Sequence, residues 1–221
     1  MPDDATPPAP GIIAIEGPIG VGKTTLARRV ADAYNTDLML EGAADNPFLE
    51  KYYADPARYA LPTQVHFLFQ RVEQLQSFRQ NDLFRAVYIS DYMLEKDRLF
   101  ARMTLSADEF RIYEQLYERV VDTVPVPDLV IYLHAPVPTL LERIRRRGLD
   151  YEQRIEAAYL HELCAAYVAF FRHYTDAPVL FVDTDGANFA EGEQPFAQLI
   201  EAIRSGIRGK HHFELDPITA V

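Results

Sequence analysis

The sequence has few of the residues that stabilise or anchor extracellular and membrane proteins. Its 221 residues include one cysteine and no tryptophan. Cys164 therefore has no partner for an intrachain disulfide and no second thiolate for a metal site. No apolar run approaches the roughly 18 residues of a membrane span, and no basic segment precedes an apolar core near the N-terminus, as it would in a secretory signal. We expect a cytoplasmic protein without a membrane partner.

Basic residues are also in the minority. The chain has 22 lysines and arginines against 33 aspartates and glutamates, which gives a formal net charge of −11. A protein with this balance repels polyanions, and no basic stripe offsets the repulsion locally. The sequence thus predicts no nucleic-acid partner and argues against a nucleic-acid-binding ATPase.

Apolar residues, by contrast, are plentiful enough for a sizeable core. They make up 48% of the chain, and a chain of this length forms one compact domain more readily than two. Residues 1–10 hold four prolines and two aspartates, which predicts a disordered lead-in. Residues 11–207 form the predicted single domain, and residues 208–221 a polar C-terminal tail.

A glycine-rich stretch carries the strongest functional signal. Residues 17–24 read GPIGVGKT and fit the phosphate-loop signature G-x-x-x-x-G-K-[ST]. An apolar strand-like run precedes them and a segment with helical spacing follows, which is the order of elements that a phosphate loop needs. A glycine-rich turn that binds nothing would not require this full signature. The predicted phosphate-binding residues are Gly17, Pro18, Ile19, Gly20, Val21, Gly22, Lys23, Thr24 and Thr25.

The chemistry of this loop predicts a nucleotide and a metal ion. Backbone N–H groups of the loop turn toward phosphate oxygens, and the helix N-terminus adds partial positive charge. Lys23 is expected to reach the β- and γ-phosphates of ATP, and the Thr24 hydroxyl to bind Mg²⁺.

Strand-like and helical segments alternate along the whole chain. This alternation predicts an α/β fold with a parallel sheet and right-handed crossovers. The five predicted strands are residues 11–15, 37–41, 86–91, 129–133 and 179–183. The predicted helices are residues 25–34, 46–53, 62–81, 95–123 with a break at 104–106, 138–147, 152–174 and 193–205. At the break, Ser106 and Glu109 form a predicted capping box.

The second and third predicted strands each end in a carboxylate, at the edge of a parallel sheet where ligands gather. Glu41 follows the second strand and is the candidate general base, because an acid beside a phosphate site can take a proton from an attacking hydroxyl. Asp91 follows the third strand and is the candidate second ligand of Mg²⁺. The alternative for each acid is a structural cap or a solvent-facing side chain.

An arginine-rich helix predicts a mobile lid. Arg143 and Arg147 are four residues apart on one helix face, and Gly148 follows directly. Arginines on a closing lid neutralise the charge of a transferring phosphoryl group, and closure excludes water. The alternative is a solvated basic face that pairs with neighbouring acids.

With these motifs in place, the sequence resembles the deoxynucleoside kinases over about residues 12–171. The segment from Tyr53 to Gln64 is similar to the Y-x-D-P…P-x-Q segment of this family. The resemblance implies a three-layer P-loop nucleoside kinase fold with an Arg-rich lid, and Glu41 as the base that accepts the proton of the sugar 5′-hydroxyl. It also implies that Tyr53 and Glu152 bind the sugar 3′-hydroxyl and that Gln64 reads the base edge. Arg143 and Arg147 match lid arginines.

The resemblance further bears on the base. Arg71 and Asp97 fall where deoxycytidine and deoxyguanosine kinases carry an arginine–aspartate pair that faces the base. A carboxylate aimed at the thymine O4 would leave two acceptors facing each other, which costs roughly 1–3 kcal/mol. We therefore expect deoxyadenosine, deoxyguanosine or deoxycytidine as the substrate in preference to thymidine, and a homodimer as in related kinases.

The sequence departs from the family pattern after the third strand. There the family has an acid followed by Arg and Ser, whereas this chain has Tyr92 and Met93 after the acid, and Leu149 takes the place of a further lid arginine. Arg98 and the lid arginines are the candidates to replace the missing cation. Two rival functions stay open: a thymidylate-type monophosphate kinase, for which only Arg58 offers acceptor-phosphate binding, and a nucleotide-binding regulatory protein without transfer chemistry.

Overall fold

A parallel six-stranded sheet forms the centre of the molecule. The computed structural model describes residues 11–81, 87–185, 189 and 192–215. Within them the strand order is β2-β3-β1-β4-β5-β6, and every neighbouring pair is parallel. This confirms the predicted α/β class. The strands are β1 (Ile12–Glu16), β2 (Leu38–Met39), β3 (Tyr88–Ser90), β4 (Leu129–His134), β5 (Val179–Asp183) and β6 (Lys210–Phe213).

Strand β6 corrects the predicted count of five strands. It lies inside residues 208–221, which the sequence predicts as a polar tail, and it pairs with β5 from Val179–Lys210 to Val182–Phe213. Its first three side chains are exposed, and the His212 ring stacks on Phe181 with the ring centres 4.7 Å apart. An edge strand pairs through its backbone on one side only and needs no apolar alternation. Its polar composition therefore concealed it.

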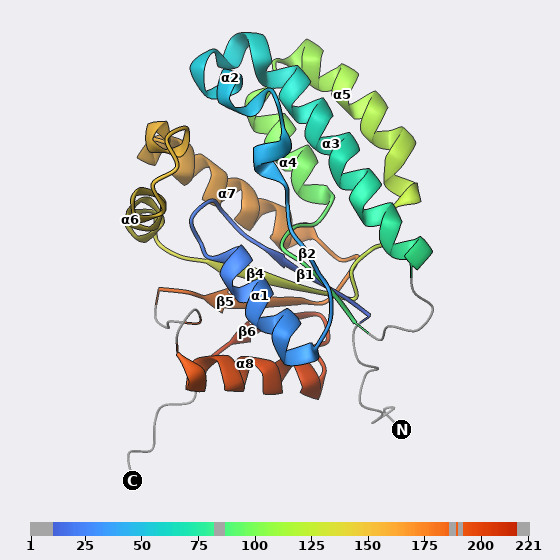
Figure 1. Cartoon of the computed structure of the whole chain (residues 1–221), viewed down its shortest axis with the longest axis vertical. Coiled ribbons are helices and arrows are strands. Elements are labelled where there is room, and N and C mark those ends of the chain that lie inside the picture. Colours follow the sequence, from blue (N-terminus) through green and yellow to red (C-terminus); the bar gives the residue numbers. More distant parts are fainter. Residues whose placement is uncertain (1–10, 82–86, 186–188, 190–191, 216–221) are drawn as a thin grey trace.

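Helices cover both faces of this sheet. Figure 1 shows α1 and α8 on one side of it and α4 and α7 on the other, with α3 and α5 further from the sheet. The helices are α1 (Lys23–Tyr34), α2 (Leu49–Ala54), α3 (Pro56–Asn81), α4 (Glu95–Thr104), α5 (Ala107–Val120), α6 (Val137–Arg147), α7 (Ala157–His173) and α8 (Glu193–Ser205). Short 3₁₀ turns lie at Ala43–Asp45, Val121–Thr123 and Glu152–Arg154.

Two apolar clusters hold these layers together. The larger joins the sheet to α1, α7 and α8, and it includes Val130 and Ile131 of β4, which are both fully buried. The smaller joins α3, α4 and α5. Helix α3 contributes Leu68, Val72 and Leu75 to this second cluster, so the apolar side of this helix serves the core. No helix within the described residues combines the length and apolar character that a bilayer span requires.

Helix boundaries differ most from the prediction at the starts of α3 and α7. Helix α3 begins at Pro56, because the first turn of a helix accepts proline without losing a hydrogen bond, and it continues through Pro62. Helix α7 begins only at Ala157, after the short turn around Glu152. The capping box is confirmed, since the Glu109 N–H donates to Ser106 Oγ and the Ser106 N–H donates to Glu109.

Candidate active site

A cavity of about 1060 Å³ opens at the carboxyl ends of the central strands. The phosphate loop forms one wall, α3 and α4 form another, and the arginine-rich end of α6 forms a third. The cavity brings together most of the predicted site residues, although they come from distant parts of the chain. The predicted residues that line it are Ile19, Gly20, Val21, Gly22, Lys23, Thr24, Thr25, Glu41, Tyr53, Gln64, Arg71, Asp91, Arg143, Arg147 and Glu152.

The phosphate loop owes its path to its glycines. Gly17, Gly20 and Gly22 have φ angles of +150°, +83° and +104°, in the region that favours glycine. A Cβ atom on Gly17 would lie 2.4 Å from the Leu133 carbonyl oxygen, so this position has no room for a side chain. Lys23 Nζ donates to the carbonyl oxygens of Gly17 at 2.7 Å and Pro18 at 3.1 Å. The loop thus holds its lysine over its own concave side.

A buried acid that the sequence analysis missed anchors the start of this loop. Glu16 ends β1 and is fully buried. Its Oε1 accepts from the Gly17 N–H at 2.9 Å and from the Tyr167 hydroxyl at 2.8 Å, and its Oε2 accepts from the Met93 N–H at 3.2 Å. Glu16 therefore ties the phosphate loop to α7 and to the segment after β3. An acid at the end of an otherwise apolar strand was the available signal.

Asp91 joins the phosphate loop to the candidate base. Its Oδ2 accepts from the Thr24 hydroxyl at 2.6 Å, and its Oδ1 accepts from the Glu41 N–H at 2.7 Å. Among the described residues, no cluster of three or more acidic, histidine or cysteine side chains is arranged for a metal. Mg²⁺ in nucleotide sites needs only one or two protein oxygens, because phosphates and water supply the rest. Thr24 and Asp91 fit that requirement.

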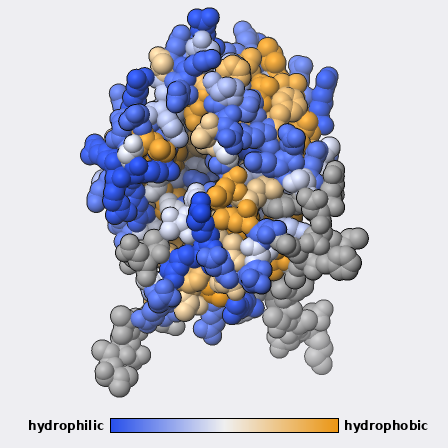
Figure 2. Space-filling view, viewed as in Figure 1, coloured by the Kyte–Doolittle hydropathy of each residue, from blue (hydrophilic) through white to orange (hydrophobic). Residues whose placement is uncertain are grey.

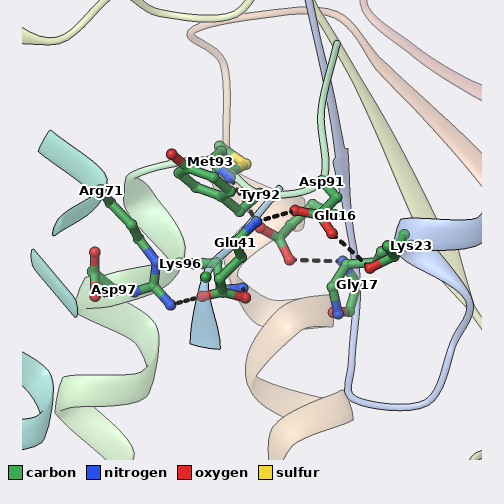
Figure 3. A network of polar contacts seen from close by, with 12 residues as sticks. Glu16, Gly17, Lys23, Glu41, Arg71, Asp91, Tyr92, Met93, Lys96 and Asp97 are labelled. Atoms are coloured by element: carbon green, nitrogen blue, oxygen red, sulfur yellow. Dashed lines mark hydrogen bonds and ion pairs between the residues drawn. The ribbon is translucent and has the colours of Figure 1, made fainter. Parts of the chain in front are cut away.

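Glu41 lies between two cations. Figure 3 shows Arg71 and Lys96 reaching the Glu41 carboxylate, while Asp91 holds the Glu41 backbone. Lys96 Nζ lies 2.7 Å from Glu41 Oε2, and an Arg71 nitrogen pairs with Glu41 Oε1. Burial favours the protonated acid, but the charges of Arg71 and Lys96 outweigh it and hold the pKa of Glu41 well below its usual range. The candidate base is therefore a carboxylate.

Asp97 stands behind Arg71, which corrects its expected place facing the base. Arg71 bridges Glu41 and Asp97 with its two terminal nitrogens. Asp97 is fully buried and is not among the residues that line the cavity. Burial raises the pKa of Asp97 to about 6, although Arg71 opposes this rise. In this arrangement Arg71, and not Asp97, reaches the cavity wall.

Buried polar atoms around Arg71 leave hydrogen-bonding capacity for a ligand. Gln64 is 5% exposed and lines the cavity. Within the described part of the chain, Gln64 Oε1, Arg71 Nε and Asp97 Oδ2 have no hydrogen-bond partner. Buried polar atoms are rarely left unpaired, so this end of the cavity fits a ligand with donors and acceptors on a planar edge.

Aromatic rings and an acid also line this cavity. The Tyr53 ring packs on Tyr151 with the ring centres 5.6 Å apart. Glu152 is 8% exposed, and its Oε2 accepts from Arg147 Nε at 2.9 Å. Burial first, and then the charge of Glu152, raise the pKa of Tyr53. Tyr151 was not predicted, because a tyrosine between two acids carries no pattern of its own.

The two predicted lid arginines have different environments. Arg143 donates to Val21 O at 3.2 Å and to the side chain and carbonyl of Thr184 at 2.9 and 2.7 Å. It therefore already lies at the phosphate loop. Arg147 is the last residue of α6, its side chain is 46% exposed, and it pairs with Glu152.

Arg98 is excluded as the replacement for the missing family arginine. It donates to both carboxylate oxygens of Glu114, at 2.7 and 2.6 Å, and it does not line the cavity. Tyr92, at the position of the missing arginine, is fully buried and donates its hydroxyl to Gln74 Oε1 at 2.7 Å. The cation that reaches Glu41 from this part of the chain is Lys96, which the sequence analysis did not single out.

A phosphate loop, a deprotonated acid and a deep neighbouring pocket together define a P-loop phosphotransferase that acts on a small hydroxylated acceptor. The comparisons with known proteins identify the class more closely. The profile of the deoxynucleoside kinase family matches residues 13–208, and the chain belongs to this family. This confirms the resemblance seen in the sequence and argues against a regulatory protein without transfer chemistry.

The matches to individual relatives cover nearly the whole chain. It is 34% identical over 197 residues to the deoxyguanosine kinase of Bacillus subtilis (strain 168), which covers 87% of this chain and 95% of the relative. It is 30% identical over 210 residues to the deoxyadenosine/deoxycytidine kinase of the same organism, covering 90% and 94%. The solved deoxyadenosine kinase from M. mycoides with bound dATP matches with a TM-score of 0.75 at 26% identity, covering 86% of this chain and 99% of that one.

Proposed function

We propose that this kinase transfers the γ-phosphoryl group of ATP to the 5′-hydroxyl of a deoxynucleoside, and that deoxyadenosine, deoxyguanosine or deoxycytidine is favoured over thymidine. The product is the 5′-monophosphate, as in nucleotide salvage. The observation that carries the proposal is the deprotonated Glu41 in the cavity that the phosphate loop also lines. Names of relatives that include deoxyguanosine, deoxyadenosine and deoxycytidine kinases support the choice of base.

In the proposed reaction, a bond forms between the sugar 5′-oxygen and the γ-phosphorus while the bond to the β,γ-bridging oxygen breaks. ADP leaves, and the hydroxyl proton passes to Glu41. Lys23, Arg143 and Arg147 bind the phosphate oxygens and offset their negative charge. Lys23 then exchanges its two loop carbonyl partners for phosphate oxygens.

Thr24 and Asp91 are the proposed ligands of Mg²⁺. Their oxygens already lie 2.6 Å apart, so both could hold the ion, and the Thr24 hydroxyl would keep its proton and turn it away from Asp91. When bound, Mg²⁺ neutralises charge on the transferring phosphates. Asp91 also holds the Glu41 backbone, so the metal site and the base are fixed by one side chain.

The nucleoside is held at both ends in this proposal. Tyr53 and Glu152 bind the sugar 3′-hydroxyl, and Gln64 and Arg71 meet the edge of the base. Asp97 orients Arg71 from behind. Gln64 Oε1, which has no partner within the described residues and belongs to a cavity-lining side chain, is an acceptor suited to an amino group of adenine, guanine or cytosine. Thymine O4 would instead bring a second acceptor to this wall, which disfavours thymidine.

Transfer of labelled phosphate from ATP to each of the four deoxynucleosides and to thymidylate, with and without Mg²⁺, tests the proposal. We expect Mg²⁺-dependent 5′-monophosphate from deoxyadenosine, deoxyguanosine or deoxycytidine, with thymidine slowest. Thymidine as the best substrate would overturn the assignment of the base. Product from thymidylate alone would mean a monophosphate kinase, and activity in EDTA would remove Mg²⁺ from the scheme.

The proposal includes a cytoplasmic location and a homodimeric assembly. The single cysteine supports a reducing compartment, because no disulfide contributes to the fold. The assembly is considered with the whole molecule below.

A further inference from the structure

Lys96 occupies a position that ordinarily disfavours a cation. It is 4% exposed and lies in the first turn of α4. Burial removes the hydration of its ammonium group, and the positive end of the helix dipole repels it. Because both burial and the helix dipole disfavour the charged ammonium group, an anion close to Lys96 is needed to stabilise it.

Within the described residues, Lys96 shares its anionic partner with a second cation. Lys96 Nζ donates to Glu41 Oε2 at 2.7 Å, but Glu41 already pairs with Arg71. Arg71 and Lys96 together balance Glu41 and Asp97. Without Lys96, this wall of the cavity would carry a net negative charge and would repel phosphate oxygens.

Lys96 also lies near the lysine of the phosphate loop. Both side chains line the same cavity. Burial lowers the pKa of Lys23 to about 8, and the charge of Lys96 is the next largest cause of this lowering. Two ammonium groups that repel each other across a cavity are both stabilised when an anion enters between them.

The geometry at Glu41 puts the transferring group within reach of Lys96. A hydroxyl that gives its proton to Glu41 lies within about 3 Å of the carboxylate. Since Lys96 Nζ is 2.7 Å from that carboxylate, the hydroxyl oxygen lies within about 6 Å of Nζ. A lysine stem has four flexible carbons, so a small rotation closes the remaining gap.

From these contacts we propose that Lys96 is a catalytic residue that binds the phosphoryl group on the 5′-oxygen, and that it passes from Glu41 to that group as the new bond forms. The inference rests on the proposed function, because it needs a 5′-hydroxyl acceptor at Glu41. As Lys96 leaves, Glu41 loses one of its two cations and becomes a better proton acceptor when the hydroxyl proton must be taken up.

Ligands that differ only by the 5′-phosphate test this role. We would measure, by calorimetry, binding of the preferred deoxynucleoside and of its 5′-monophosphate to the wild type and to Lys96→Met. The variant should bind the monophosphate about tenfold to a hundredfold more weakly, the loss expected for one charged hydrogen bond. Its affinity for the deoxynucleoside should stay within about threefold, because that ligand makes no such bond. Lys96→Arg should restore part of the monophosphate affinity.

Two further variants keep the test decisive. Arg98→Met removes a second cation of α4, one that pairs with Glu114 outside the cavity, and should leave both affinities unchanged. Lys96→Gln keeps a hydrogen-bond donor for Glu41 without the charge, and it replaces Lys96→Met if that variant does not fold. Equal affinities of the wild type and the Lys96 variant for the monophosphate, or equal losses for both ligands, would overturn the inference. Failure of the wild type to phosphorylate any deoxynucleoside would instead overturn the proposed function.

Discussion

At the scale of single residues, the site depends on charged side chains that each pair with two partners of opposite charge. Arg71 forms ion pairs with both Glu41 and Asp97, and Glu41 forms ion pairs with both Arg71 and Lys96. This sharing keeps Glu41 ionised in a buried place, where an unpaired acid would take up a proton. A weakly basic carboxylate suits phosphoryl transfer. In a loose transition state the new bond to phosphorus has hardly formed, so the hydroxyl proton needs to leave only late in the reaction.

The role of Glu41 as the base predicts a specific kinetic defect. Glu41→Gln keeps the shape of the side chain and loses the proton acceptor. We expect kcat to fall by about 10²–10⁴, while the dissociation constant of the deoxynucleoside changes little, because the interaction is needed in the transition state. Steady-state kinetics and calorimetric binding measure the two quantities separately.

Glu114→Gln is the matched control for this prediction. Glu114 is also an acid with an arginine partner, but it pairs with Arg98 outside the cavity. Its substitution should leave kcat unchanged. Near-normal turnover of the Glu41 variant would exclude Glu41 as the base.

At the scale of secondary structure, successive charged residues of α4 point in different directions and have different roles. Lys96 turns toward the cavity, Asp97 supports Arg71 in the interior, and Glu95 lies on a third side near Asp176. Burial, and then the charges of Asp176 and Glu16, raise the pKa of Glu95 to about 7, from 4.5 for a free side chain. The helix therefore holds an acid whose ionisation opposes folding.

This acid predicts a pH-dependent stability. Between pH 4.5 and about 7 the folded state keeps a proton that the unfolded chain has released. The contribution of Glu95 to the free energy of unfolding therefore falls as pH rises through this window and is constant above it. Glu95→Gln removes the titration, so the variant should gain about 2 kcal/mol over the wild type between pH 5 and pH 8. Urea unfolding at both pH values measures this gain, and an equal difference at the two values would contradict the prediction.

At the scale of the whole molecule, the surface is mainly hydrophilic, with some apolar side chains left outside the core. Figure 2 shows hydrophilic residues over most of one face and apolar surface gathered over the upper helices. Four large apolar side chains are about half exposed: Phe69, Ile112, Val126 and Val168. Val168 lies on α7, one of the helices that flank the sheet.

A homodimer through the flanking helices follows as a prediction from these exposed side chains. We expect sedimentation equilibrium to give twice the 25.2 kDa mass of one chain. Val168→Asp would bury a charge in the interface and should shift the protein toward the monomer. Val126→Asp, at an equally exposed position in the loop before β4, should remain a dimer. A wild-type mass of one chain would exclude the dimer.

Local patterns in the sequence determined much of this protein. The phosphate loop, the capping box at Ser106 and the acids that follow β2 and β3 were predicted from spacing and from neighbours a few residues away. The apolar strand β4 was predicted for the same reason, since a strand covered on both faces needs apolar side chains throughout. These features led to the fold class and to the family from sequence alone.

Only the tertiary structure decided which charges meet. The Lys96–Glu41 contact joins residues 55 positions apart, and the Arg71–Glu41 contact spans 30. Such pairs depend on how helices pack on the sheet, and the short EKDR run at the start of α4 looks like an ordinary solvated helix turn. The polar edge strand β6 was also missed from the sequence. It pairs with β5 through backbone atoms, and this pairing needs no recognisable pattern of side chains. The sequence therefore determined the parts of the catalytic site, and packing decided which cations hold its base.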